Sequence, residues 1–240
     1  MDVPKIKTRF EVKNQADEET VELYLYGTIR QAYWWDEEDD CISAKRVRTS
    51  LSNAKGKKIK VHINSGGGDV FESIAINNLL KQHDSEVEVH IDSLAGSGAS
   101  IIAMAGDKIY MPNNAMIMIH KAWTFASGNA DELRKTANDL DKIDESVKAS
   151  YKNRFVGTDD ELNDLVADES WLTAEECLAF GFCDEILEEE KEDDKKQENN
   201  IRESLFNKYK NNISAKVNDE AESKRPALFN AFKQNLGGNE

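Results

Sequence analysis

The chain has 240 residues, 39% of them hydrophobic, which is enough for one domain of ordinary size with a packed core. Its 46 acidic and 31 basic residues give a formal net charge of -15, which would repel nucleic acid phosphates and anionic lipid surfaces. Residues 1–10 contain no apolar signal-peptide core, and no apolar run approaches the roughly 20 residues of a membrane-spanning helix. We therefore expect a soluble cytoplasmic protein that binds neither nucleic acid nor membrane.

The first 187 residues alternate short β-rich runs with segments of helical periodicity. Apolar residues at helical spacing predict one helix around Ile42 to Leu51 and a second around Val70 to Leu80. The alternation predicts right-handed βαβ crossovers and a largely parallel sheet, which is an α/β fold. The predicted strands cover residues 21–29, 57–64, 86–92, 108–111 and 115–120.

The later part of this region is predicted to be mainly helical. A long polar helix is expected over about 130–154. Two Thr-x-x-Glu capping boxes, at 158–161 and 173–176, each predict a helix start, and the second of these helices should end at Gly181. The apolar side of the long helix is formed by Leu133, Leu140, Ile143 and Val147.

The composition changes after Leu187, where residues 188–200 read EEEKEDDKKQENN and contain no apolar side chain. We predict a domain over 1–187, with 34 acidic and 21 basic residues, followed over 188–240 by an acidic linker and a mostly disordered tail. In the tail the hexamers LFNKYK and LFNAFK, at 205–210 and 228–233, are similar. They are either short docking motifs on a flexible tether or a chance similarity.

The cysteines offer neither a disulfide framework nor a zinc site. Their number is odd and no Cys-x-x-Cys pair occurs, so we expect three reduced thiols. They are Cys41, Cys177 and Cys183.

Three glycines stand between a predicted strand and a predicted helix, in the sequence NSGGGDV at 64–70. Such a turn exposes backbone N–H groups at a helix N-terminus, where negative charge is stabilised. A phosphate-binding loop and a plain tight turn both fit this pattern. No Gly-Lys-Ser/Thr follows, which excludes a Walker loop.

A serine lies between the strand that ends near Asp92 and an apolar helix, in the sequence AGSGAS at 95–100. The segment is similar to a Gly-x-Ser-x-Gly nucleophile elbow with alanine in place of the outer glycines. Ser97 would either present its hydroxyl as a nucleophile or only cap the helix. Ser100 lies one turn inside the helix, where we expect its hydroxyl to bond back to the backbone.

Of the four histidines, His120 is the candidate base. His120 ends an apolar strand, and the carboxyl ends of strands are where open α/β sheets hold catalytic groups. His62 and His90 lie inside predicted strands, where a structural role is expected. His83 is expected at an exposed helix end.

Taken in order, these motifs resemble those of the Clp family of serine peptidases, over about Val21 to Ile186. The run AMAGDK at 103–108 and the polar tail most resemble the Clp-like head maturation (prohead) proteases of tailed phages and prophages. The resemblance rests on the glycine turn, the serine elbow, AGDKIYMPN at 105–113, MIH at 118–120 and WLTAEE at 171–176.

The resemblance implies a Clp/crotonase-type fold with a protruding handle helix, assembled in a closed ring or double ring. It implies that Ser97 attacks a peptide carbonyl after His120 takes its proton, without a metal ion or another cofactor. The family's oxyanion hole falls on the backbone N–H groups of Gly68 and Gly98.

The same resemblance assigns substrate contacts and a third triad residue. Gly67, Asp69 and Val70 would pair with the backbone of an extended peptide. The family has an aspartate where this chain has Glu169, and the neighbouring Asp168 stays open as an alternative acid.

The implied function is a serine endopeptidase that processes phage scaffold and capsid precursors during head maturation. Its expected partners are protein or peptide substrates, further copies of the chain in a ring, and scaffold or capsid protein. Three alternatives stay open: a housekeeping Clp peptidase fed by an ATP-driven unfoldase, a crotonase-like acyl-CoA enzyme, and a non-catalytic structural ring protein. A crotonase would not need Ser97 and His120 together.

Overall fold

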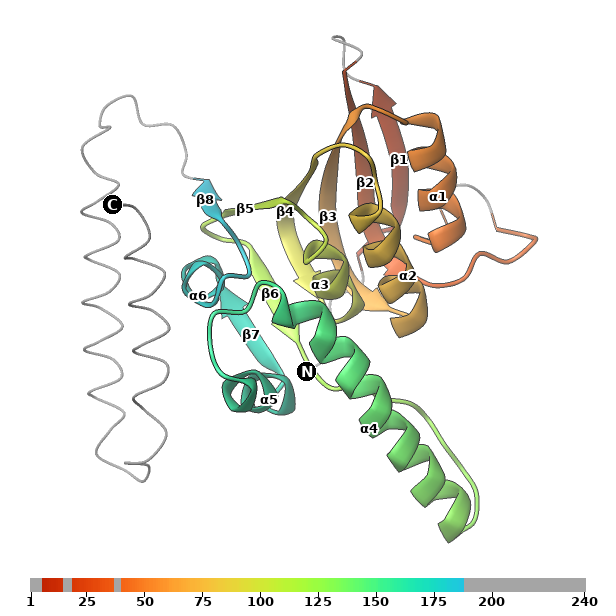
Figure 1. Cartoon of the computed structure of the whole chain (residues 1–240). Coiled ribbons are helices and arrows are strands. Elements are labelled where there is room, and N and C mark those ends of the chain that lie inside the picture. The colour runs from red at the N-terminus through yellow and green to blue at the C-terminus, as the bar shows by residue number, and fades with distance from the viewer. Residues whose placement is uncertain (1–5, 15–18, 37–39, 188–240) are drawn as a thin grey trace.

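The structure is a computed structural model that describes residues 6–14, 19–36 and 40–187 (Figure 1). The predicted tail and its two similar hexamers lie outside these residues. The strands are β1 (Arg9–Asn14), β2 (Thr20–Ile29), β3 (Lys58–Gly68), β4 (Val87–Gly96), β5 (Lys108–Pro112), β6 (Met116–Ile119), β7 (Ser170–Thr173) and β8 (Glu185–Leu187). The helices are α1 (Ala44–Asn53), α2 (Val70–Lys81), α3 (Gly98–Ala103), α4 (Ala130–Lys152), α5 (Asp159–Ala167) and α6 (Ala174–Phe180). None of these helices combines the length and the apolar character that crossing a bilayer requires.

A mainly parallel sheet forms the centre of the domain. β2, β3, β4, β5 and β8 lie side by side in that order and run parallel, and β6 also pairs in parallel with β4. β1 pairs antiparallel with β2 at one edge, and β7 pairs antiparallel with β6. The predicted α/β fold with a largely parallel sheet is confirmed.

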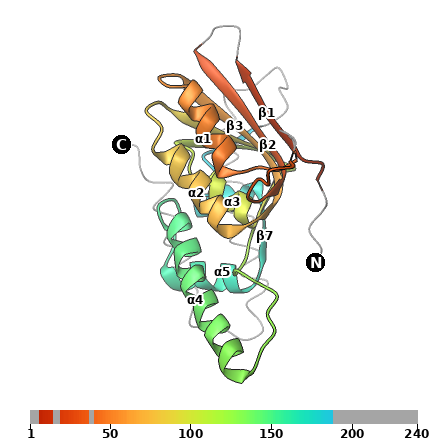
Figure 2. The ribbon, with the colours of Figure 1, turned by 90° about the vertical axis from the view of Figure 1, so that its right-hand side faces the viewer.

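Helices cover one face of this sheet. α1, α2 and α3 lie along the same side of the strands (Figures 1 and 2). On β3 the residues facing them, Ile59, Val61 and Ile63, are buried, whereas Lys60 and His62 are only half-buried. This alternation differs from the continuous apolar runs of parallel strands covered on both faces.

A row of stacked rings crosses the other face of the sheet. Tyr24, His62, His90 and Tyr110 occupy neighbouring register positions on β2, β3, β4 and β5. Their ring centroids follow one another at 4.6, 5.2 and 4.8 Å. Asp92 accepts a hydrogen bond from the Tyr26 hydroxyl at 2.6 Å, and one of its oxygens lies 3.0 Å from His62 Nδ1. The two strand histidines thus belong to the surface of the sheet.

The first predicted helix begins later than expected. α1 starts at Ala44, where the Ser43 side chain accepts a hydrogen bond from the Arg46 N–H. Ile42 lies outside the helix and pairs with Ile29 next to the end of β2. Its burial reflects this bridge, so it does not belong to the apolar side of a helix.

The long helix α4 protrudes from the body of the domain (Figures 1 and 2). It begins with a capping box between Asn129 and Glu132 and ends two residues before the predicted limit. Only the later part of its apolar side is buried in the domain: Val147 is 3% exposed and Leu133 is 43% exposed.

Both predicted Thr-x-x-Glu capping boxes are present. The Thr158 and Thr173 side chains accept the N–H of Glu161 and Glu176, which in turn bond back to the cap N–H groups. α6 is followed by Gly181 at φ 79, a left-handed conformation that favours glycine.

Candidate active site

Ser97 occupies a strained turn between β4 and α3. Its φ of 51° and ψ of -123° are unfavourable for a residue with a side chain and cost about 1–3 kcal/mol. The Ser97 N–H donates to the Met118 carbonyl on β6 at 2.8 Å, which fixes the turn against the sheet. The Ser97 side chain makes no capping hydrogen bond, so the interpretation as a helix cap is wrong.

His120 follows β6 and lies next to this serine. β4 and β6 pair in parallel with Gly96 opposite Met118, so the residues after both strands emerge at the same edge of the sheet. There His120 Nε2 lies 2.7 Å from Ser97 Oγ, a distance for a hydrogen bond. Two side chains 23 residues apart in sequence are thus brought together as a nucleophile and a base would be.

The pKa of the His120 imidazole lies below its ordinary value of 6.5. Burial is the main cause, because it disfavours the charged form, and the carboxylates of Glu169 and Asp144 act in the opposite direction. The imidazole is therefore neutral at neutral pH, as a general base must be.

Of the two candidate acids, Glu169 faces His120. Its Oε2 lies 4.0 Å from His120 Nδ1, which is longer than a hydrogen bond. The φ of Glu169 is 51°, the second left-handed backbone of a non-glycine residue in the described part of the chain. Asp168 is the C-cap of α5, and its N–H donates to the Asp164 carbonyl at 2.9 Å.

The glycine segment belongs to the end of β3 and does not form a tight turn, one of the two forms that its sequence allowed. Gly66, Gly67 and Gly68 are the last residues of β3, and Asp69 is the N-cap of α2. A Cβ on Gly67 would lie 2.7 Å from the Gly98 nitrogen, and a Cβ on Gly68 would lie 1.9 Å from the Ile29 oxygen. The glycines are thus required by the close approach of three backbones.

Two backbone amides of this segment have different environments. The Gly67 N–H donates to Ser65 Oγ at 3.0 Å, and Ser65 in turn donates to the Gly27 carbonyl. The Gly68 nitrogen lies 3.5 Å from the position of a Cβ on Gly98, so the amides of Gly68 and Gly98 are neighbours beside Ser97.

The start of α2 forms one side of the site. Asp69 Oδ1 accepts the N–H groups of Phe71 and Glu72 at 2.9 Å, and the Asp69 N–H donates to the Ile29 carbonyl. The Asp69 side chain is therefore engaged as a helix cap, and its backbone N–H and carbonyl are bonded to Ile29 and Ser73.

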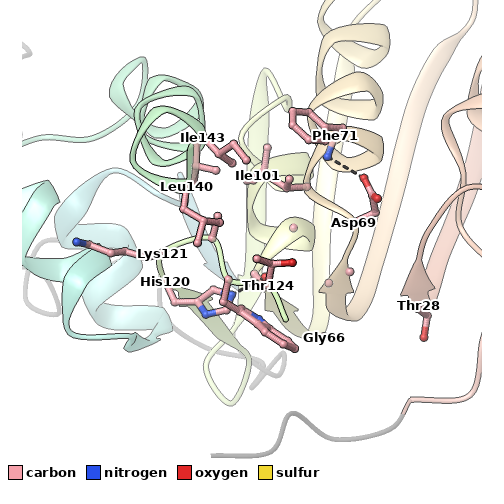
Figure 3. A pocket seen from close by; sticks show the side chains of 18 of the residues that line it. Thr28, Gly66, Asp69, Phe71, Ile101, His120, Lys121, Thr124, Leu140 and Ile143 are labelled. Atoms are coloured by element: carbon pink, nitrogen blue, oxygen red, sulfur yellow. Dashed lines mark hydrogen bonds between the residues drawn. The ribbon is translucent and has the colours of Figure 1, made fainter. Parts of the chain in front are cut away.

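A cleft of about 900 Å³ opens beside Ser97 and His120 (Figure 3). Leu140 and Ile143 point into it from α4, and Phe71 stands on the opposite side (Figure 3). The predicted contact residues Gly67, Asp69 and Val70 all line it. α4 and α2 thus contribute apolar side chains to the cleft, while the end of β3 contributes backbone groups.

Ser100, the competing serine, has its hydroxyl engaged. It is fully buried, donates to the Ser97 carbonyl at 2.5 Å and lies 2.8 Å from the Tyr151 hydroxyl. This back-bonding agrees with the sequence-based expectation.

Sequence reasoning missed Asp144. It is 7% exposed and lies three residues before Val147 and four after Leu140, within the apolar side of α4. The charge of Asp144 among the apolar positions of this helix side was the signal in the sequence that could have identified it.

Within the described ranges, no three His, Cys, Asp or Glu side chains gather as ligands for a metal ion.

Comparisons with known proteins agree with this geometry. The family model described as Clp protease matches residues 38–190, more than half of the chain. The ATP-dependent Clp protease proteolytic subunit of Bacteroides fragilis is 28% identical over 135 residues, 55% of this chain and 65% of the relative. The subunits of the same name from Deinococcus radiodurans and Leuconostoc citreum are 29% and 33% identical, and the match covers 68% of each. The chain thus spans slightly less than two thirds of the Bacteroides relative.

Proposed function

Because the chain belongs to the Clp protease family, we propose that it is a serine endopeptidase with Ser97 as nucleophile and His120 as general base. The observation that carries the proposal is the 2.7 Å distance between Ser97 Oγ and His120 Nε2. Such a hydrogen bond prepares the serine hydroxyl for deprotonation as it attacks.

The proposed reaction begins when Ser97 Oγ attacks the peptide carbonyl carbon and its proton passes to His120 Nε2. The resulting imidazolium then protonates the leaving amine, and an acyl-enzyme remains on Ser97. A water molecule, deprotonated by His120, releases the acyl group and restores the serine. The lowered pKa of His120 supports this role, since it keeps the base neutral before attack.

Gly68 and Gly98 are the proposed donors for the oxygen anion of the tetrahedral intermediate. The proximity of both amides to Ser97 supports this assignment. The Gly67 N–H is bonded to Ser65, which favours Gly68 as the donor within the glycine segment. One such donor contributes on the order of 100-fold or more to the rate.

Glu169 is the proposed third residue of the triad. Its carboxylate is on the Nδ1 side of His120, where it can favour the tautomer that leaves Nε2 unprotonated. The 4.0 Å distance supports an electrostatic role in the free enzyme, and catalytic contacts often shorten when substrate binds.

The proposed substrate is an extended peptide that contacts Gly67, Asp69 and Val70 at the edge of the cleft. The apolar wall that Leu140 and Ile143 provide favours an apolar side chain next to the cleaved bond.

The test is Ser97→Ala in the full chain, with Ser100→Ala as matched control. We expect Ser97→Ala to abolish peptide hydrolysis and labelling by a fluorophosphonate, because it removes the hydroxyl that is hydrogen-bonded to His120. Ser100→Ala should keep labelling, since its hydroxyl is engaged with Tyr151. Labelling of the Ser97→Ala chain, or hydrolysis by it, would overturn the assignment.

The biological role is a finer proposal, in which copies of the chain form a ring and trim phage scaffold and capsid precursors. It is supported by the resemblance of the AMAGDK run at 103–108 to Clp-like prohead proteases. The relatives named ATP-dependent Clp protease proteolytic subunits favour the second candidate, a housekeeping subunit fed by an unfoldase. Purification of the native assembly with or without an ATPase distinguishes the two.

A further inference from the structure

Asp144 is a buried carboxylate close to the proposed base. It lies about four turns into α4 and is 7% exposed, whereas Asp141 and Glu145 on the same helix are exposed. A carboxylate buried in an apolar helix side is costly unless it is hydrogen-bonded. We therefore expect the Asp144 carboxylate to have a specific hydrogen-bond partner.

The contact is made to the segment that follows His120. Asp144 Oδ1 accepts the backbone N–H of Ala122 at 2.7 Å, a short, charge-assisted hydrogen bond. The strand pairing of β6 ends at Ile119, so His120 and Ala122 lie beyond the ladder that fixes the strand. The bond from Asp144 therefore restrains the backbone immediately after the base.

The charge of Asp144 also acts on the imidazole. Together with Glu169 it favours the protonated form of His120 and partly offsets the effect of burial on its pKa. Lys121, next in the chain, also lines the cleft (Figure 3), as do Asp69 and Asp139. Asp144 thus acts on the base from α4, through the Ala122 N–H and through its charge, whereas Glu169 faces His120 from the segment before β7.

Resting on the proposed triad, we propose that Asp144 is a positioning residue for His120. It holds the backbone that follows the imidazole through the Ala122 N–H, and it supplies a second negative charge for the imidazolium that forms when Ser97 loses its proton. The protruding helix α4 is in this way a structural part of the active site.

The test compares Asp144→Asn and Asp144→Ala in the full chain, with Asp141→Asn as a control that removes an exposed charge from the same helix. We expect Asp144→Ala to lower kcat by about 10- to 100-fold with little change in KM, because the base is misplaced. Asp144→Asn keeps an acceptor for Ala122, so it should lose less.

The pH profile separates positioning from a merely structural role. Without the negative charge the imidazolium is less stable, so the acid limb of kcat/KM for Asp144→Asn should move to lower pH by about half a unit. Asp141→Asn should leave the limb in place. An unshifted limb with unchanged kcat in a folded Asp144→Asn chain would overturn the proposal.

A second variant covers the case in which Asp144→Asn does not fold. Asp144→Glu keeps the charge on a longer side chain, so we expect a lower kcat with the acid limb unshifted. Full wild-type kcat in Asp144→Glu, or a limb shifted to lower pH by half a unit, would contradict the proposal. If the proposed triad itself were wrong, the result would be different: the wild-type chain would neither hydrolyse peptides nor react with a fluorophosphonate at Ser97.

Discussion

At Ser97 the backbone conformation, rather than a helix cap, directs the hydroxyl toward His120. A serine that caps a helix accepts a hydrogen bond from a backbone N–H with its hydroxyl oxygen, and this bond would hold the hydroxyl at the helix end, away from the base. At φ 51 and ψ -123 the Ser97 side chain makes no such capping bond to the amides of α3. The same segment leaves the second hydroxyl, that of Ser100, buried and bonded.

The choice between Glu169 and Asp168 can be tested directly. We expect Glu169→Gln to lower kcat/KM by at least tenfold, because a neutral amide stabilises the imidazolium of His120 less well than a carboxylate does. Asp168→Asn should change it by less than about threefold, since Asp168 is the C-cap of α5. Steady-state kinetics on one peptide measures both, and the reverse ranking would transfer the role to Asp168.

At the scale of elements, the site depends on three chain segments that pack without side chains between them. The ends of β2 and β3 and the turn before α3 meet at Ile29, Gly67 and Gly98. Gly98 also faces α2, where an added Cβ would lie 2.2 Å from Ser73 Oγ and 3.1 Å from Ser73 Cβ. Small residues here set the distance between the two proposed oxyanion donors.

A double-mutant cycle on Gly98 and Ser73 tests this packing. Gly98→Ala should destabilise the fold by about 1–3 kcal/mol through overpacking. Ser73→Ala removes the clashing oxygen at a cost of about 1 kcal/mol for its hydrogen bond to the Asp69 carbonyl. The double variant should therefore be more stable than the sum of the two changes predicts, as measured by urea unfolding. Strict additivity would show that Ser73 is not what restricts position 98.

The parallel strands were predictable because the helices cover only one face of the sheet. On β3, Ile59, Val61 and Ile63 alternate with polar residues, which marks a strand and the face that it buries. β7 and β8 have four and three residues, too few for a period of two to show. The pairing of β7 with β6 joins residues distant in sequence, so a local sequence pattern does not predict it.

The candidate site was predictable only in part. Ser97 and His120 lie at strand ends, where a local pattern and a resemblance both indicate them. The extended form of the glycine segment depends on the approach of Ile29 and Gly98, which come from other parts of the chain. The role proposed for Asp144 likewise follows from a contact across 22 residues.

At the scale of the whole molecule, the row of rings on the open face of the sheet makes stability depend on pH. The pKa of His90 is lowered from 6.5 to about 4, first by burial and then by electrostatic interaction with the neighbouring His62 and Lys60. The folded protein therefore keeps His90 neutral where the unfolded chain would protonate it. Between pH 6.5 and about 4 the unfolded state binds more protons, so the free energy of unfolding falls as the pH falls.

His90→Phe should reduce this pH dependence, because phenylalanine can stack in the row without titrating. The contribution of His90 is fully present above pH 6.5, and up to about 3 kcal/mol of it is lost as the pH approaches 4. Urea unfolding of the full chain from pH 7 to pH 4.5, at constant protein concentration, measures the difference. His83→Gln is the control, and equal slopes for the wild-type and His90→Phe chains would refute the account.

Ser97 and Glu169 are the non-glycine residues with positive φ in the described part of the chain, and both belong to the proposed triad. Glycine at either position would relieve backbone strain of about 1–3 kcal/mol, while removing the functional group that the strain presents. Selection for thermal stability alone would thus favour an inactive chain. Laboratory evolution for heat resistance without an activity screen should therefore accumulate substitutions at these two positions.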